Sequence, residues 1–143
     1  MGDELAMIID DAVKEAAFIL NCMIKFADIP KGDSHKRRFF VYGKSIRDVR
    51  NPEIKTKYGI GILYIIDGII YEVKKPLMIE LTVATARVYV DRFMGLVNDL
   101  SNAYSSVDIW QFDMEFMQMV GSGKVSKVTD KKIIAMLNRR RSK

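Results

Sequence analysis

Residues 77–104 constrain the fold of this chain more than any other stretch, because their apolar side chains recur at the spacing of one long amphipathic helix. Pro76 stands just before the stretch, where a proline without an N–H is tolerated at a helix start. The residues expected on the apolar face are Ile79, Val83, Ala86, Tyr89, Val90, Phe93, Leu96, Val97, Leu100 and Tyr104. We expect the rest of the chain to pack against this face.

Three further helices are expected. The first runs from about Asp3 to Ala27 and ends before Pro30, and its single cysteine, Cys22, lies among apolar neighbours as a small hydrophobe. Residues 110–116 alternate with period two, which is typical of a strand, but their Met, Glu and Gln residues favour the helix that we predict. The last helix is expected from Thr129 to the C-terminal arginines.

The chain between the first two helices predicts strands. Residues 60–66 and 69–73 are apolar runs rich in β-branched residues, joined by Asp67 and Gly68, which is the pattern of a hairpin with a type I′ turn. A third short strand is expected around Phe39. Because the hairpin is apolar on both faces, its second face needs cover from the Phe39 region, a partner or another copy of the chain.

These elements predict a mainly α fold, a helical bundle with a small antiparallel hairpin or three-stranded insertion at about residues 37–75. We expect one domain over residues 1–143, with a basic tail at residues 138–143.

Charge is distributed unevenly along the chain. Residues 31–57 carry nine basic and three acidic side chains, and residues 121–143 carry eight and one, whereas residues 1–30 and 58–120 are acidic. Each basic segment alone is explained as a solvated surface, but two on one small domain favour phosphate contact. The predicted contacts form two patches, Lys36, Arg37 and Arg38 in the first, and Lys132, Arg139, Arg140 and Arg141 in the second.

Aromatic residues interleave with the first patch. Phe39, Phe40 and Tyr42 beside cations suit single-stranded nucleic acid, since rings stack on bases while cations meet phosphates. The alternative is that Phe39, Phe40 and Val41 are core residues.

Motifs for catalysis and cofactors are missing from the sequence. One histidine, His35, and one cysteine make no credible zinc site. Gly121 to Lys124 is not a phosphate loop, because Gln118 replaces its first glycine and Val125 replaces its Ser or Thr. We therefore predict no catalytic residue, no metal and no cofactor, and a protein that is not an enzyme.

Location is expected to be cytoplasmic. The first residues are acidic where a secretory signal is basic, no apolar run is long enough to cross a membrane, and a single cysteine suits a reducing compartment.

The order of the first helix, the Phe39 strand, the hairpin at 60–73 and the helices from Leu77 onward resembles the small subunit of archaeal type I CRISPR effector (Cascade) complexes. The resemblance covers the whole chain as layout and size, and it transfers no functional residue. It implies a non-catalytic subunit of an antiviral complex, lying along guide RNA and target DNA.

We therefore expect a non-catalytic, sequence-independent nucleic-acid-binding subunit of a larger nucleoprotein assembly that contacts the nucleic-acid backbone. The alternative is a module for protein interaction or self-association through the 60–73 hairpin and the Met-rich helix. The third hypothesis is a small enzyme whose active site is formed by carboxylates dispersed along the sequence.

Overall fold

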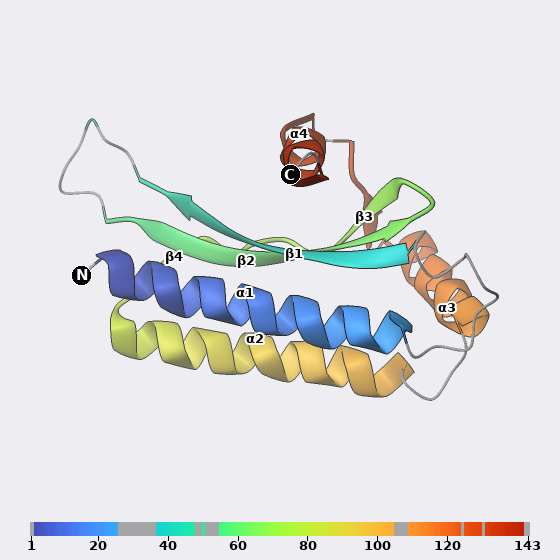
Figure 1. The fold of residues 1–143 in the computed structure, drawn as a ribbon, viewed down its shortest axis with the longest axis horizontal. Helices are drawn as coiled ribbons and strands as arrows, with labels where there is room; N and C mark the ends of the chain where they lie inside the picture. Colours follow the sequence, from blue (N-terminus) through green and yellow to red (C-terminus); the bar gives the residue numbers. More distant parts are fainter. Residues whose placement is uncertain are drawn as a thin grey trace.

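In the computed structural model, a twisted antiparallel sheet is held between a pair of long helices and a single short helix (Figure 1). The structure describes residues 2–25, 37–47, 50, 55–104, 109–123, 125–129 and 131–141. The helices are α1 (Gly2–Lys25), α2 (Val83–Tyr104), α3 (Ile109–Gly121) and α4 (Lys131–Arg141). The strands are β1 (Arg37–Ile46), β2 (Lys57–Ile66), β3 (Ile69–Lys74), β4 (Ile79–Glu80) and β5 (Ser126–Lys127).

Strand β2 is the centre of the sheet. It pairs with β1 along its whole length, and its other edge is shared by β3, from Ile62 onward, and by β4 at Lys57 and Tyr58. In the gap between them, the backbone N–H of Ile60 donates a hydrogen bond of 2.9 Å to the Tyr89 hydroxyl of α2. Strand β5 extends the sheet beyond β3.

The predicted hairpin is confirmed. Strands β2 and β3 are joined by Asp67 and Gly68, whose φ angles of 51° and 84° are the two positive values that a type I′ turn requires. The strand predicted around Phe39 is confirmed as β1, and the helices predicted at the N-terminus, around residues 110–116 and at the C-terminus are confirmed as α1, α3 and α4.

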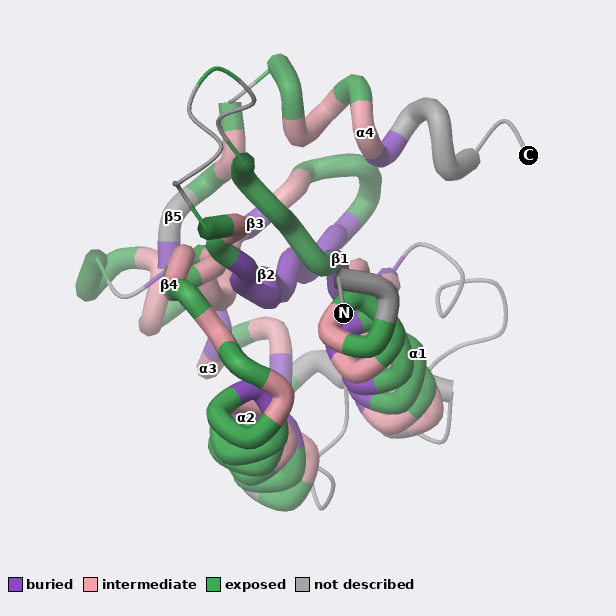
Figure 2. Tube along the Cα trace, turned by 90° about the vertical axis from the view of Figure 1, so that its left-hand side faces the viewer, coloured by how far each residue is buried: buried purple, intermediate pink, exposed green. Residues whose placement is uncertain are grey.

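Both faces of the sheet are covered within the chain. On the inner face, the side chains that alternate along β1 and β2 pack against α1 and α2, which lie side by side and run in the same direction (Figure 1). On the outer face, Phe40, Tyr42, Leu63 and Ile65 pack beneath Leu137 of α4. Figure 2 shows the buried β2 between the two layers.

The predicted fold class was wrong. The expectation was a helical bundle with a small β insertion, whereas the structure is a mixed α/β fold whose sheet separates the helices into two layers. The physical reason is the two-faced hairpin: apolar residues on both sides of a strand require packing layers on both sides. The chain supplies the second layer itself, with α4.

The start of the long helix was also placed wrongly. Residues 77–82 are extended, and β4 within them pairs with β2, so that α2 begins only at Val83. Thr82 and Thr85 form a capping box at this point. The Thr85 N–H donates to the Thr82 hydroxyl at 3.2 Å, and the Thr82 N–H donates to the Thr85 hydroxyl at 2.8 Å.

Asn21 of α1 closes part of the free edge of β1. Its side-chain amide donates to the Phe39 carbonyl at 3.0 Å, and its side-chain oxygen accepts from the Phe39 N–H at 2.9 Å. The Asn21 side chain therefore occupies the place of a neighbouring strand at this position.

Two glycines of β2 leave room on the outer face. A Cβ at Gly61 would lie 2.6 Å from the Tyr42 ring, and a Cβ at Gly59 would lie 2.8 Å from the Cβ of Pro76 and 3.0 Å from the Leu77 carbonyl oxygen. The absence of side chains at these positions lets Tyr42 and residues 76–78 lie directly over the backbone of β2.

Gly59 and Gly95 are predicted to respond oppositely to alanine. Gly59→Ala should reduce the free energy of unfolding by about 1–3 kcal/mol, because backbone atoms of residues 76–78 must move. Gly95→Ala, where the new Cβ meets nothing within 4 Å on α2, should raise it by up to about 1 kcal/mol through helix propensity. Urea unfolding followed by circular dichroism measures both. A Gly59→Ala protein as stable as the wild type would contradict the close packing described.

Candidate nucleic-acid interface

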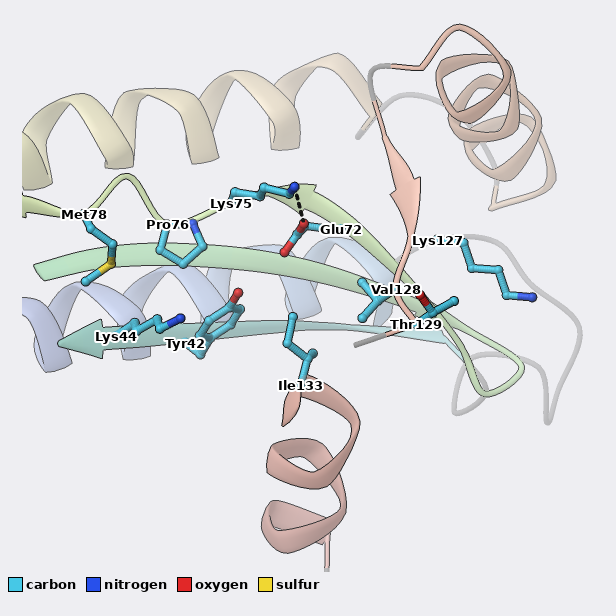
Figure 3. Close-up of a pocket in the computed structure, with 10 residues that line it drawn as sticks. All are labelled: Tyr42, Lys44, Glu72, Lys75, Pro76, Met78, Lys127, Val128, Thr129 and Ile133. Carbon is cyan, nitrogen blue, oxygen red and sulfur yellow. Dashed lines mark ion pairs between the residues drawn. The ribbon is translucent and has the colours of Figure 1, made fainter. Parts of the chain in front are cut away.

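The outer face carries an open pocket of about 390 Å³ beside the N-terminal end of α4 (Figure 3). Its lining comes from β1, β3, the 75–78 segment, β5, the residues that lead into α4 and α4 itself. The residues are Tyr42, Lys44, Glu72, Lys75, Pro76, Met78, Lys127, Val128, Thr129 and Ile133. Three lysines and one glutamate give this pocket a net positive charge.

The strand geometry of β1 places cations and rings in one column. Because side chains alternate along a strand, Arg38 and Lys44 share the outer face with Phe40 and Tyr42. The Phe40 and Tyr42 rings are stacked with centroids 6.1 Å apart, and the Arg38 guanidinium lies over Phe40 at 5.8 Å from the ring centroid. Arg38, Phe40 and Lys44 thus share the outer face, where Tyr42 is buried, whereas Phe39 and Val41 are core residues of the inner face, as the alternative predicted.

Strand β5 brings the C-terminal basic segment to the same face. Lys127 pairs with Tyr71 of β3, and the Val128 N–H donates to the Ile70 carbonyl at 2.8 Å. This pairing directs the chain across the sheet, so that α4 packs on the outer face through Ile133, Met136 and Leu137. Lys131 and Lys132, at the start of α4, are exposed.

The predicted contact residues have different places. Lys36 lies outside the described residues, as does His35. Arg38 lies on the outer face, and Lys132 is exposed on α4. Arg139, Arg140 and Arg141 form the last residues of α4, and their side chains lie outside the described part. Among the described side chains, Arg38 from the first predicted patch and Lys132 from the second are therefore the two found on or beside the outer face.

Arg37 has a structural role. Its Nε lies 2.7 Å from Oδ2 of Asp113 on α3, and the side chains of the two residues are only 6% and 16% exposed. Burial lowers the pKa of Arg37, but the hydrogen bond and the charge of Asp113 outweigh this effect and raise it. A buried, paired guanidinium is not positioned for phosphate, so Arg37 is not among the contacts that we propose.

Tyr64 completes this buried network. Its hydroxyl donates a hydrogen bond of 2.9 Å to Oδ1 of Asp113, and its ring packs against Phe39, Phe112 and Phe116. Burial, with the negative charge of Asp113 and the hydrogen bond to it, raises the pKa of Tyr64 well above its usual range. The hydroxyl remains a donor, and the network fixes α3 to β1 and β2.

Sequence reasoning did not place Lys75 or Glu72 at a site, and it included Lys44 and Lys127 only as members of the two basic segments, without naming them among the contacts. The alternation from Arg38 to Lys44 in β1 was sufficient to place Lys44 beside Arg38. No local pattern indicates that Lys75 and Lys127 share a pocket, because this depends on the pairing of β5 with β3.

A second, more apolar groove of about 460 Å³ lies between β4 and α2. Leu77, Val88 and Leu96 are 63%, 53% and 42% exposed there, and Lys74, Glu80 and Arg92 stand among the lining residues.

The chain matches no family model, no curated protein and no solved structure. Within the described part, no three His, Cys, Asp or Glu side chains gather in a group that could hold a metal ion. None of the described helices is both long and apolar enough to cross a membrane.

Removing one partner of the Arg37–Asp113 pair is predicted to cause a large loss of stability. Asp113→Ala should reduce the free energy of unfolding by about 3–5 kcal/mol, because Arg37 remains buried without its carboxylate. Replacing the whole network, with Arg37→Met, Asp113→Leu and Tyr64→Phe, should recover most of this loss, because the Tyr64 hydroxyl also depends on Asp113. The control is Glu115→Ala on the same helix, whose hydrogen bond to Gln111 is exposed. Equal, small losses for both alanine variants in urea unfolding would contradict the assigned role.

Proposed function

We propose that this protein is a non-catalytic nucleic-acid-binding protein that contacts backbone phosphates through the outer face of its sheet. The observation that carries the proposal is the separation of charge across the sheet. Helix α1 has five acidic and two basic residues and α3 has two acidic and no basic ones, whereas α4 has five basic and no acidic ones. The helix that lies alone on the outer face is thus the basic one (Figure 1).

The outer pocket adds cations to the same side. Lys44, Lys75 and Lys127 line it, and Lys132 is exposed on the adjacent helix. Clustered cations displace the counterions condensed on a nucleic acid, and this release favours binding independently of sequence. The acidic α1 and α3, in contrast, repel a polyanion, so the charge distribution favours one orientation of the bound strand.

The resemblance to Cascade small subunits is not part of this proposal. It rested on a helical bundle with a small β insertion, which is not the layout of this fold, and no comparison bears on it.

Protein interaction or self-association is the second candidate. The Met-rich helix first expected for it, α3, has Met114 and Met117 exposed at 58% and 42%, but the hairpin is not available as expected. Both faces of the hairpin are covered, and Ile62 and Tyr64 are fully buried, so Lys substitutions there would disrupt the core. The observation in favour of this candidate is the exposed apolar groove at Leu77, Val88 and Leu96.

The proposal predicts a steep dependence of binding on salt. Anisotropy of labelled single- and double-stranded DNA and RNA should give a slope of log K against log salt of about −3 to −4 if four cations meet phosphates. Changing Lys44, Lys127 and Lys132 to Gln should reduce the magnitude of this slope by about 2 to 3.

The control removes the same number of charges from the inner layer. Lys14 is exposed on α1, and Arg87 and Arg92 are exposed on α2, so changing these three to Gln lowers the net charge equally. This variant should retain a slope close to that of the wild type. No binding at low salt, or an equal reduction of the salt slope in the two triple variants, would contradict the proposed interface.

A further inference from the structure

Glu72 is an unexpected residue in a basic pocket, because it is a mostly buried acidic side chain that lines the same space as three lysines. Its side chain is 10% exposed. The one ion pair it forms among the described residues is with Lys75, at 3.9 Å, and Lys75 itself is 81% exposed. This separation is too long for a hydrogen bond. Because none of the described side chains donates a hydrogen bond to it, the Glu72 carboxylate is an acceptor that a ligand in the pocket can reach.

The surroundings of Glu72 limit what can use this acceptor. Figure 3 shows Glu72 and Lys75 on one side of the pocket, with Tyr42 and Lys44 across from them. Pro76, Met78 and Ile133 add apolar surface, and the volume of about 390 Å³ is within the range of small-molecule sites, roughly 300–1,000 Å³. The pocket therefore combines an apolar wall, a carboxylate acceptor and a cationic rim.

Simple ions fit this combination poorly. Free phosphate would meet the lysines but would be repelled by Glu72, and a metal or ammonium cation would meet Glu72 but would be repelled by the lysines. A nucleotide satisfies all three features, since its base is flat and apolar on its faces, its edge carries N–H donors, and its phosphate is anionic.

The chemistry of a carboxylate selects among the bases, because an ionised carboxylate only accepts hydrogen bonds. Guanine presents two adjacent donors, N1–H and N2–H, on its Watson–Crick edge. Thymine and uracil present one N–H between two carbonyl oxygens, which a carboxylate repels. Adenine and cytosine present an amino group beside a ring nitrogen that is itself an acceptor.

We propose that this pocket binds one unpaired guanine nucleotide of the bound strand, with the Glu72 carboxylate accepting from guanine N1–H and N2–H. Lys44 and Lys75 contact the phosphates on either side, and the pocket wall holds the base. The inference rests on the proposed nucleic-acid binding and deepens it, because it adds a base preference at one position to contacts that are otherwise independent of sequence.

The test compares two labelled single strands, (dT)12 and the same strand with one central dG, binding to the full chain at fixed salt. The strand with dG should bind about tenfold more tightly, as a two-bond base contact allows. Glu72→Gln should reduce this preference to less than about twofold without weakening the binding of (dT)12, because the amide presents N–H groups to guanine and removes a negative charge. Glu72→Asp, which keeps the charge, should retain part of the preference.

The matched control is Glu80→Gln on β4, which removes an exposed carboxylate outside this pocket and should leave the preference intact. Equal affinity of the wild type for both strands, or a guanine preference that persists in Glu72→Gln, would overturn the inference.

Titration with free nucleotides separates this inference from the proposed function. Guanosine 5′-monophosphate should shift the NMR signals of Val128 and Thr129 at lower concentration than uridine 5′-monophosphate does, and Glu72→Gln should remove the difference. If this occurs while neither strand binds, the pocket inference is supported and the proposed function fails. If (dT)12 binds with a steep salt slope but guanine has no advantage in either assay, the proposed function stands and the pocket inference fails.

Discussion

The burial of β2 on both faces is the constraint on which the rest of the structure depends. Every residue from Tyr58 to Ile66 is buried, so the strand needs an apolar layer above it and another below it. Helices α1 and α2 provide the first layer, and α4 provides the second. The hydrophobic requirement of one strand therefore sends the basic C-terminal helix to the side opposite the acidic N-terminal helix. The charge separation that suggests a function is a consequence of how the core is covered.

Polar groups inside this architecture act mainly as connectors. Arg37 and Tyr64 both bind Asp113, and this joins two strands to α3, while Asn21 joins α1 to the edge of β1 through the backbone of Phe39. Each connection crosses many residues in the sequence and fixes the orientation of one helix on the sheet. Glu72 differs from these groups because no described residue donates a hydrogen bond to it. Its carboxylate is therefore available to a ligand, whereas the other polar groups are used within the protein.

Local patterns predicted the elements better than their assembly. The apolar spacing of α1 and the Asp67–Gly68 turn depend on neighbouring residues alone, and both predictions are confirmed. The mainly α class was wrong because β1, β2, β3 and β5 form one sheet that separates the helices into two layers, and the start of α2 was wrong because residues 77–82 were assigned to a helix. Leu77, Ile79 and Leu81 alternate as in a strand, and the capping box that begins at Thr82 marks the true helix start. Side chains alternate between the two faces of β1, so the adjacent arginines point to opposite sides. Arg37 lies in the core, and Arg38 lies on the outer face. Asp113, which pairs with Arg37 in the core, is distant in the sequence, and no local pattern indicates this pairing.

The central claim is that nucleic acid lies on the outer face and not on the helical layer, and lysine protection tests it most directly. The full chain would be acetylated at low salt with and without single-stranded DNA, and the modification of each lysine would be quantified by mass spectrometry. We expect Lys44, Lys127 and Lys132 to be protected severalfold and Lys14 on α1 to react equally in both samples. Protection of Lys14 as strong as that of the outer lysines, or no protection of any lysine under conditions where the DNA is bound, would contradict the account.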